Sequence, residues 1–93
     1  MIVDSINCGK LVHSVRPEYP KDARRKRIQG IVSLRVVVAK TGEMRDVQAL
    51  DGDPLLIPSA LSAVKQWRYT PCILNSEAVE VGTVVDISFN LDQ

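Results

Sequence analysis

Six positive side chains are concentrated in one short stretch, "RPEYPKDARRKRIQG" (residues 16–30), and together they could bind an anion. They account for half of the 12 Lys and Arg residues of the 93-residue chain. A cluster of this kind can bind nucleic-acid phosphate or a membrane surface, or it can simply cover the water-facing side of a helix. The six are Arg16, Lys21, Arg24, Arg25, Lys26 and Arg27.

The overall charge argues against a dedicated nucleic-acid binder. The formal net charge is only +1, whereas such proteins usually have a strongly basic balance. Single-strand binders also need exposed aromatic side chains, and the few aromatics here include Trp67 and Phe89, which we expect in the core. The charge is nevertheless asymmetric, because no Lys or Arg follows Arg68 while four acidic residues do. The sequence therefore predicts a basic pole and an acidic strip.

The remaining reactive residue types form no recognisable site. Cys8, Cys72 and His13 lack metal-ligand spacing. A disulfide between the two cysteines is one alternative, and two unpaired thiols is the interpretation that the sequence favours. Asp51 and Asp53 resemble the start of a calcium loop, but no Glu follows at the required distance, so we interpret them as turn residues.

No catalytic motif supports an enzyme. The serines lack a G-x-S-x-G turn, and no phosphate-cradling loop is present. We therefore expect a non-enzymatic protein that needs no cofactor and no metal.

The elements that position the cationic stretch follow from proline and glycine. Pro17, Tyr19 and Pro20 fix the entry into a helix that we expect to begin at Pro20 and to run to about Gln29. Gly30 suits the left-handed residue that ends such a helix. Most of the cations would then face water. Before this helix, alternation in residues 10–16 predicts a short strand or extended arm.

The following residues predict a hairpin. Residues 31–40 are apolar on both faces, which favours a central strand, and Gly42 permits a tight turn into a return strand at 43–50. Met44 and Val47 differ in parity, so both can face the core only if a bulge lies near Arg45 or Asp46.

A second helix and a long strand complete the chain. Pro58 can open a helix whose apolar residues, among them Val64 and Trp67, recur at helical spacing, and Trp67 is expected in the core. Residues 69–78 are interpreted as a loop. Residues 79–91 alternate apolar and polar side chains, which predicts a strand with one buried face.

These elements predict an α+β fold. We expect a small three-stranded antiparallel sheet in the order 2-1-3, counting from the strand at 31–40, with two helices on one face and a short N-terminal strand or arm. The last strand would then lie at an edge, where it is available for pairing with another chain.

The motifs of the chain resemble those of a known family, the C-terminal domain of TonB, over about residues 10–92. The P-x-Y-P entry and W-R-Y-x-P, at this separation and with these elements between them, are the most specific part of the resemblance. The matching residues are Pro17, Tyr19, Pro20, Ala23, Ile28, Gly30, Val32, Val38, Gly42, Val47, Ala63, Val64, Trp67, Arg68, Tyr69, Pro71, Val85 and Phe89.

The resemblance implies a periplasmic domain of an energy transducer that is anchored in the inner membrane. It implies an anchor that couples to ExbB and ExbD, and capture of the "TonB box" of outer-membrane transporters, as in siderophore uptake, by strand addition along the last strand. Peptidoglycan contact and a homodimer with exchanged strands are further implied partners. The alternative function is a periplasmic protein- or peptidoglycan-interaction module that energises no transporter.

Carried over position by position, the resemblance places partner binding on two segments. The first comprises Arg16, Pro17 and Tyr19, although the best-studied relatives have Gln where this chain has Arg16. The second is the docking strand, Val84, Val85, Asp86, Ile87, Ser88 and Phe89. Residues 1–9 are expected to form an N-terminal tail and residues 10–93 the domain. No 18-residue apolar run is present, and the first residues lack signal-peptide character, so any anchor is expected outside this chain.

Overall fold

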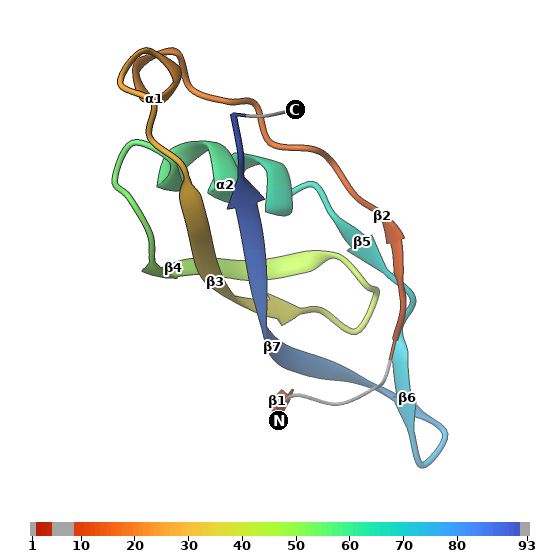
Figure 1. Ribbon diagram of the computed structural model, residues 1–93. Helices are drawn as coiled ribbons and strands as arrows, with labels where there is room; N and C mark the ends of the chain where they lie inside the picture. Colours follow the sequence, from red (N-terminus) through yellow and green to blue (C-terminus); the bar gives the residue numbers. More distant parts are fainter. Residues whose placement is uncertain (1, 5–8, 92–93) are drawn as a thin grey trace.

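The main sheet of the protein is built around its two longest strands. The computed structural model describes residues 2–4, as backbone, and residues 9–91. Within them β3 (Gly30–Val38) pairs antiparallel with β4 (Met44–Asp51) on one side and with β7 (Glu77–Phe89) on the other (Figure 1). The predicted order of these three strands and the central position of β3 are confirmed.

The sheet is larger than the predicted three strands. β1 (Ile2–Asp4) pairs in parallel with β7, and β6 (Cys72–Leu74) pairs antiparallel with its first residues, which gives a five-stranded sheet. The expectation of a loop at residues 69–78 was therefore wrong. A two-residue turn joins β6 to β7, and both of its residues, Asn75 and Ser76, have positive φ (50° and 68°), as a hairpin turn that matches strand twist requires.

A second, two-stranded sheet confirms the short N-terminal strand. β2 (Leu11–His13) pairs antiparallel with β5 (Arg68–Tyr69). The backbone N–H of Thr70 donates to the Lys10 carbonyl (2.8 Å), and the Lys10 N–H donates to the Thr70 hydroxyl (2.7 Å). These bonds hold the arm against the chain that follows the second helix.

The core lies on one face of the main sheet. The even-numbered residues of β3, Val32, Leu34 and Val36, are fully buried there. The helix α2 (Ile57–Val64) lies along this face and buries Ala60 and Val64 against it (Figure 1). Ala23 from α1 (Lys21–Arg25) joins the same cluster. Both helices therefore contribute to one core.

The predicted bulge in the return strand is present. Val36 pairs with Val47 and Val38 pairs with Met44, so Arg45 is the extra residue. Met44 and Val47 consequently both pack against the core despite their different parity. A second register shift near Leu34 leaves Leu50 as an extra residue, and its side chain is exposed.

The first helix is shorter than predicted. It ends at Arg25, and Arg27 instead of Gly30 has the left-handed conformation (φ 56°) that stops it. The N–H of Ile28 donates to the Ala23 carbonyl (2.8 Å) and that of Arg27 to the Arg24 carbonyl (3.1 Å), which satisfies the last carbonyls of the helix. Pro20 is the N-cap residue before the helix. The prediction of a helix to Gln29 failed because a non-glycine residue took the stop position.

Cys72 is disulfide-bonded, so the expectation of two unpaired thiols was wrong. Cys8, the other cysteine of the chain, lies outside the described residues. Cys72 is buried in the core cluster at the start of β6.

Candidate functional site

One edge of β7 is open over its second half. β3 occupies one side of β7 from Val81 to Phe89, and β1 pairs with Glu80 to Gly82. In the described part of the chain, no strand pairs with the other side of β7 between Thr83 and Phe89. Half of the backbone N–H and C=O groups of this segment therefore face away from β3, where another strand could pair with them.

The side chains of the open edge alternate as predicted. Ile87 and Phe89 are buried in the core, whereas Val84, Asp86 and Ser88 are exposed on the helix-free face. The Ser33 hydroxyl donates to the Asp86 carboxylate (2.7 Å), which fixes Asp86 over the neighbouring strand β3. The core thus anchors the edge, and its outward face stays accessible.

An extended segment, residues 14–20, joins β2 to α1 and is held by two carbonyl contacts. The indole Nε1 of Trp67 donates to the Val15 carbonyl (3.0 Å), and the Ser59 hydroxyl donates to the Glu18 carbonyl. Trp67 and Ser59 therefore position the predicted partner-binding segment.

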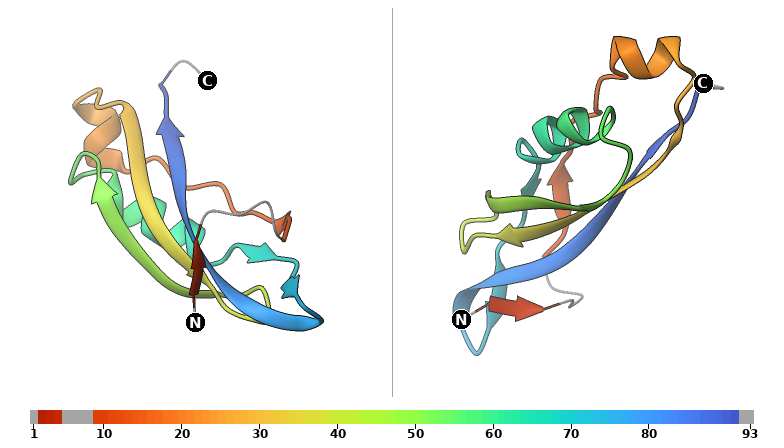
Figure 2. Two further views of the ribbon diagram at one scale, coloured as in Figure 1. Left: turned by 90° about the horizontal axis from the view of Figure 1, so that it is seen from below. Right: turned by 90° about the vertical axis from the view of Figure 1, so that its left-hand side faces the viewer.

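Tyr19 connects this segment to the end of the open edge. Its ring contacts Phe89 edge-to-face, with centroids 5.6 Å apart, and its hydroxyl donates to the Ile28 carbonyl. The Arg24 guanidinium lies 5.5 Å from the centroid of the same ring. The P-x-Y-P entry thereby places α1 at the Phe89 end of the sheet. Both views in Figure 2 show α1 at this end.

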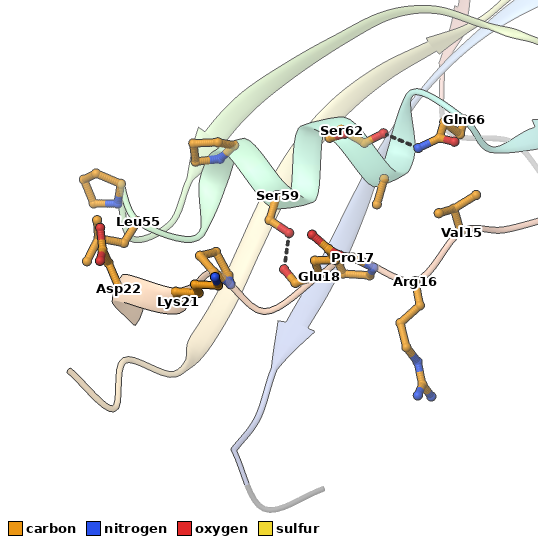
Figure 3. Close-up of a pocket in the computed structure, with 14 residues that line it drawn as sticks. Val15, Arg16, Pro17, Glu18, Lys21, Asp22, Leu55, Ser59, Ser62 and Gln66 are labelled. Atoms are coloured by element: carbon orange, nitrogen blue, oxygen red, sulfur yellow. Dashed lines mark hydrogen bonds between the residues drawn. The ribbon is translucent and has the colours of Figure 1, made fainter. Parts of the chain in front are cut away.

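A groove of about 780 Å³ separates the extended segment from α2 (Figure 3). Its lining combines apolar side chains, including Pro17, Leu55 and Ala63, with the polar side chains of Ser62 and Gln66. The Arg16 side chain starts at the rim and points away from the groove (Figure 3). Arg16 is therefore exposed for contacts outside the groove.

The structure brings the two predicted segments together at one contact, that of Tyr19 with Phe89. Arg16 and Pro17 lie earlier on the extended segment, at the groove beside α2, whose lining includes no residue of the docking strand. Sequence reasoning missed the roles of Ser59 and Trp67 in holding this segment. The sequence signal for these roles was the hydrogen-bond donor that each side chain carries. A buried indole N–H, for example, usually has a hydrogen-bond partner.

The cations of the opening stretch are exposed, as predicted. The side chains of α1 that face water include Lys21, Arg24 and Arg25, while Ala23 alone in the helix is buried.

Elsewhere, burial raises the pKa of the Tyr69 hydroxyl above its ordinary value of 10.0. No helix in the described residues is long and apolar enough to cross a membrane.

The chain is similar in sequence to known proteins. The sequence profile described as Gram-negative bacterial TonB protein C-terminal matches residues 15–91. A TonB protein of Vibrio cholerae is 35% identical over 80 residues, which are 84% of this chain and 33% of that protein. A TonB protein of Pseudomonas aeruginosa is 36% identical over 90 residues, which are 95% of this chain and 33% of that protein.

A solved structure shares the fold. The solution NMR structure of the Pseudomonas aeruginosa TonB CTD superposes with a TM-score of 0.77 at 21% identity, over 96% of this chain and 92% of that one. The chain spans about a third of the length of the two curated relatives. The matched profile covers most of the chain, and the chain belongs to the TonB C-terminal domain family.

Proposed function

We propose that this chain is the periplasmic, non-enzymatic domain of a TonB-type energy transducer and that it captures the TonB box of outer-membrane transporters. The box would add as a strand to the open edge of β7 at Val84–Phe89, next to Arg16, Pro17 and Tyr19. In the full-length protein an anchor outside this chain would couple the domain to ExbB and ExbD in the inner membrane.

The open edge is the observation that carries the proposal. Among residues 2–4 and 9–91, no strand pairs with one side of residues 83–89, while β3 holds the other side in register. In strand addition, main-chain hydrogen bonds supply affinity and the alternate side chains supply selectivity. An extended peptide needs no further pocket to bind here.

The sheet is also suited to transmitting force. Backbone hydrogen bonds in antiparallel strands run perpendicular to the strands, so a pull along β7 loads the bonds between β7 and β3 together. β7 is paired with the central strand from Val81 to Phe89, and β3 is anchored in the core by Val32, Leu34 and Val36. A load on the added strand would thus reach the core through one continuous sheet.

Amide chemical shifts during a peptide titration test the proposal. The probe is a peptide carrying the TonB box of an outer-membrane transporter from the same genome, with a scrambled peptide as control. We expect shifts concentrated at residues 83–89 and at Arg16 and Tyr19. Shifts that spare β7 would overturn the proposed function, and binding of peptidoglycan fragments alone would favour the module that energises no transporter.

The oligomeric state gives an independent check. If two copies pair through β7, the edge is occupied and the peptide must compete with the dimer. Sedimentation velocity with and without peptide then shows a dimer that dissociates on binding. A monomer in both cases leaves the edge free for the peptide.

A further inference from the structure

The two ends of the open edge differ in charge. Beyond the Phe89 end lies α1 (Figure 2), and this helix with the two residues after it carries the basic cluster: Lys21, Arg24, Arg25, Lys26 and Arg27. Toward the other end, the first residues of β7 include Glu77 and Glu80. The Arg45 guanidinium forms an ion pair with the Glu80 carboxylate, with nitrogen and oxygen 2.8 Å apart. Among the described residues, a strand that pairs with β7 therefore meets an excess of cations at the Phe89 end and acidic residues with one paired arginine at the other.

Within residues 9–91, the cations of the cluster are largely without acidic partners. In the described part of the chain its one ion pair joins Arg25 to Asp22 at 3.9 Å, and both side chains are about as exposed as free surface groups (77% and 67%). Exposed pairs of this kind contribute little. Residues 16–30, which include Arg16 as well as the cluster, hold six cations and two carboxylates, Glu18 and Asp22. A strong local positive potential remains.

Tyr19 fixes the cluster relative to the edge. The Tyr19 ring has two neighbours: the Arg24 guanidinium, 5.5 Å from the ring centroid, and the Phe89 ring, with the two ring centroids 5.6 Å apart. Arg24 is therefore about one aromatic ring away from the last residue of β7. Because charges interact over a Debye length of about 8–10 Å at physiological salt, the cluster can act on a chain that runs past Phe89.

From this placement we infer that the domain selects peptides that carry acidic residues on the side of the added strand that passes Phe89. The inference rests on the proposed function, since it concerns the flank of a peptide paired with β7. The backbone of β7 would hold the strand, and the cluster would set the direction in which the strand adds and speed its encounter. Asp86 disfavours acidic residues within the paired part, so the acidic residues belong in the flank.

Three end-capped synthetic peptides test the inference. Each has seven alternating Val and Thr residues, followed by three Glu, preceded by three Glu, or flanked on both sides by Gln. We expect one acidic peptide, and not the other, to bind about tenfold more tightly than the Gln peptide at low salt, as several exposed ion pairs allow. The difference should disappear at about 0.5 M salt, where the Debye length falls to a few ångströms.

Two triple variants locate the effect. Lys21→Gln, Arg25→Gln and Lys26→Gln together should remove the preference for the acidic peptide. The matched control combines Lys10→Gln, Lys40→Gln and Lys65→Gln. It removes the same number of positive charges from positions outside the cluster, and it should keep the preference for the acidic peptide. Equal loss in both variants would overturn the inference, because net charge and not the cluster would then be responsible.

The remaining outcomes separate this inference from the proposed function. If the Gln peptide shifts residues 83–89 and neither acidic peptide binds better, the inference is wrong and the proposed function stands. If acidic peptides shift only α1 and no peptide reaches β7, both are wrong. If an oligothymidylate of the same charge displaces the acidic peptide equally well, the cluster is a general polyanion site and the selectivity is absent.

Discussion

The ring of Tyr19 meets the ring of Phe89 edge-to-face, with the two planes at 88°. Tyr19 precedes the first helix, and Phe89 is the last residue of the longest strand, so the contact joins segments that are far apart in the sequence. Together with the hydrogen bonds from Trp67 and Ser59, it fixes the extended segment that carries Arg16 relative to the end of β7.

The Tyr19 contacts can be separated by mutation. Tyr19→Phe removes the hydrogen bond to the Ile28 carbonyl but keeps the ring, so we expect a loss of ~1 kcal/mol in the free energy of unfolding. A double-mutant cycle of Tyr19→Leu and Phe89→Leu should give a coupling of ~0.5–1.5 kcal/mol. Urea unfolding measures both quantities. Additive losses in the cycle would show that the rings do not stabilise each other.

Trp67 has two roles that different substitutions distinguish. Trp67→Ala should destabilise the fold by ~3 kcal/mol, at the lower end for a large aromatic truncation because the side chain is only partly buried. Trp67→Phe keeps most of the ring but removes the donor to the Val15 carbonyl, so it should cost less. An unchanged unfolding midpoint for Trp67→Ala would remove Trp67 from the core.

Elements with a strong pattern could be predicted from the sequence. The parity of residues in the last strand predicted which side chains of β7 are buried, and the mismatch between Met44 and Val47 predicted the bulge at Arg45. Both follow from the two-residue period of a strand, which depends only on local geometry. The order of elements along the chain predicted an open edge for the whole last strand, and this holds only for Thr83–Phe89, because β1 and β6 pair with Glu77–Gly82.

Other elements depended on tertiary contacts that no local pattern shows. β6 has three residues and becomes a strand because a turn at Asn75 and Ser76 returns it onto β7. The helix stop at Arg27 required a positive φ at a residue type that rarely adopts it. The hold of Ser59 on the Glu18 carbonyl joins residues 41 positions apart, so periodicity cannot predict it.

Gly42 should be far less replaceable than Gly30. A Cβ at Gly42 would lie 1.9 Å from the Tyr69 carbonyl oxygen, and the residue has φ 94°, whereas nothing lies within 4 Å of a Cβ at Gly30. We expect Gly42→Ala to cost at least ~2 kcal/mol, since strain and a backbone clash add, and Gly30→Ala to cost ~1 kcal/mol from its φ of 147°. Urea unfolding compares the two, and equal losses would contradict the close approach of Tyr69.

Alkaline pH should weaken the fold through Tyr69. Burial raises the pKa of its hydroxyl in the folded state, so the unfolded state loses its proton first as pH rises. The contribution of Tyr69 is therefore complete below the ordinary pKa of 10.0 and declines above it. Urea unfolding between about pH 8 and 11 should show a smaller decline for Tyr69→Phe than for the unchanged protein. Parallel declines would show that other groups cause the effect.

A lysine at the open edge should block strand addition without harming the fold. Val84 is 52% exposed on the helix-free face of β7, so Val84→Lys should change the free energy of unfolding by no more than ~0.5 kcal/mol. A lysine at this position would lie directly opposite a side chain of the added strand, and its charge must remain in contact with water. Natural edge strands carry lysines for this reason, because the charge disfavours pairing with another strand. We expect peptide affinity, measured by fluorescence anisotropy, to fall several-fold.

Ile31 provides the matched control, because it is 57% exposed on the same face but lies on β3, one strand away from the edge. Ile31→Lys adds the same charge and removes a side chain of similar kind, and it should leave peptide affinity nearly unchanged. If both variants weaken binding equally, the peptide lies across the face of the sheet. If only Val84→Lys does, the peptide pairs with the edge of β7, because a side chain on β7 contacts an added strand directly and one on β3 does not.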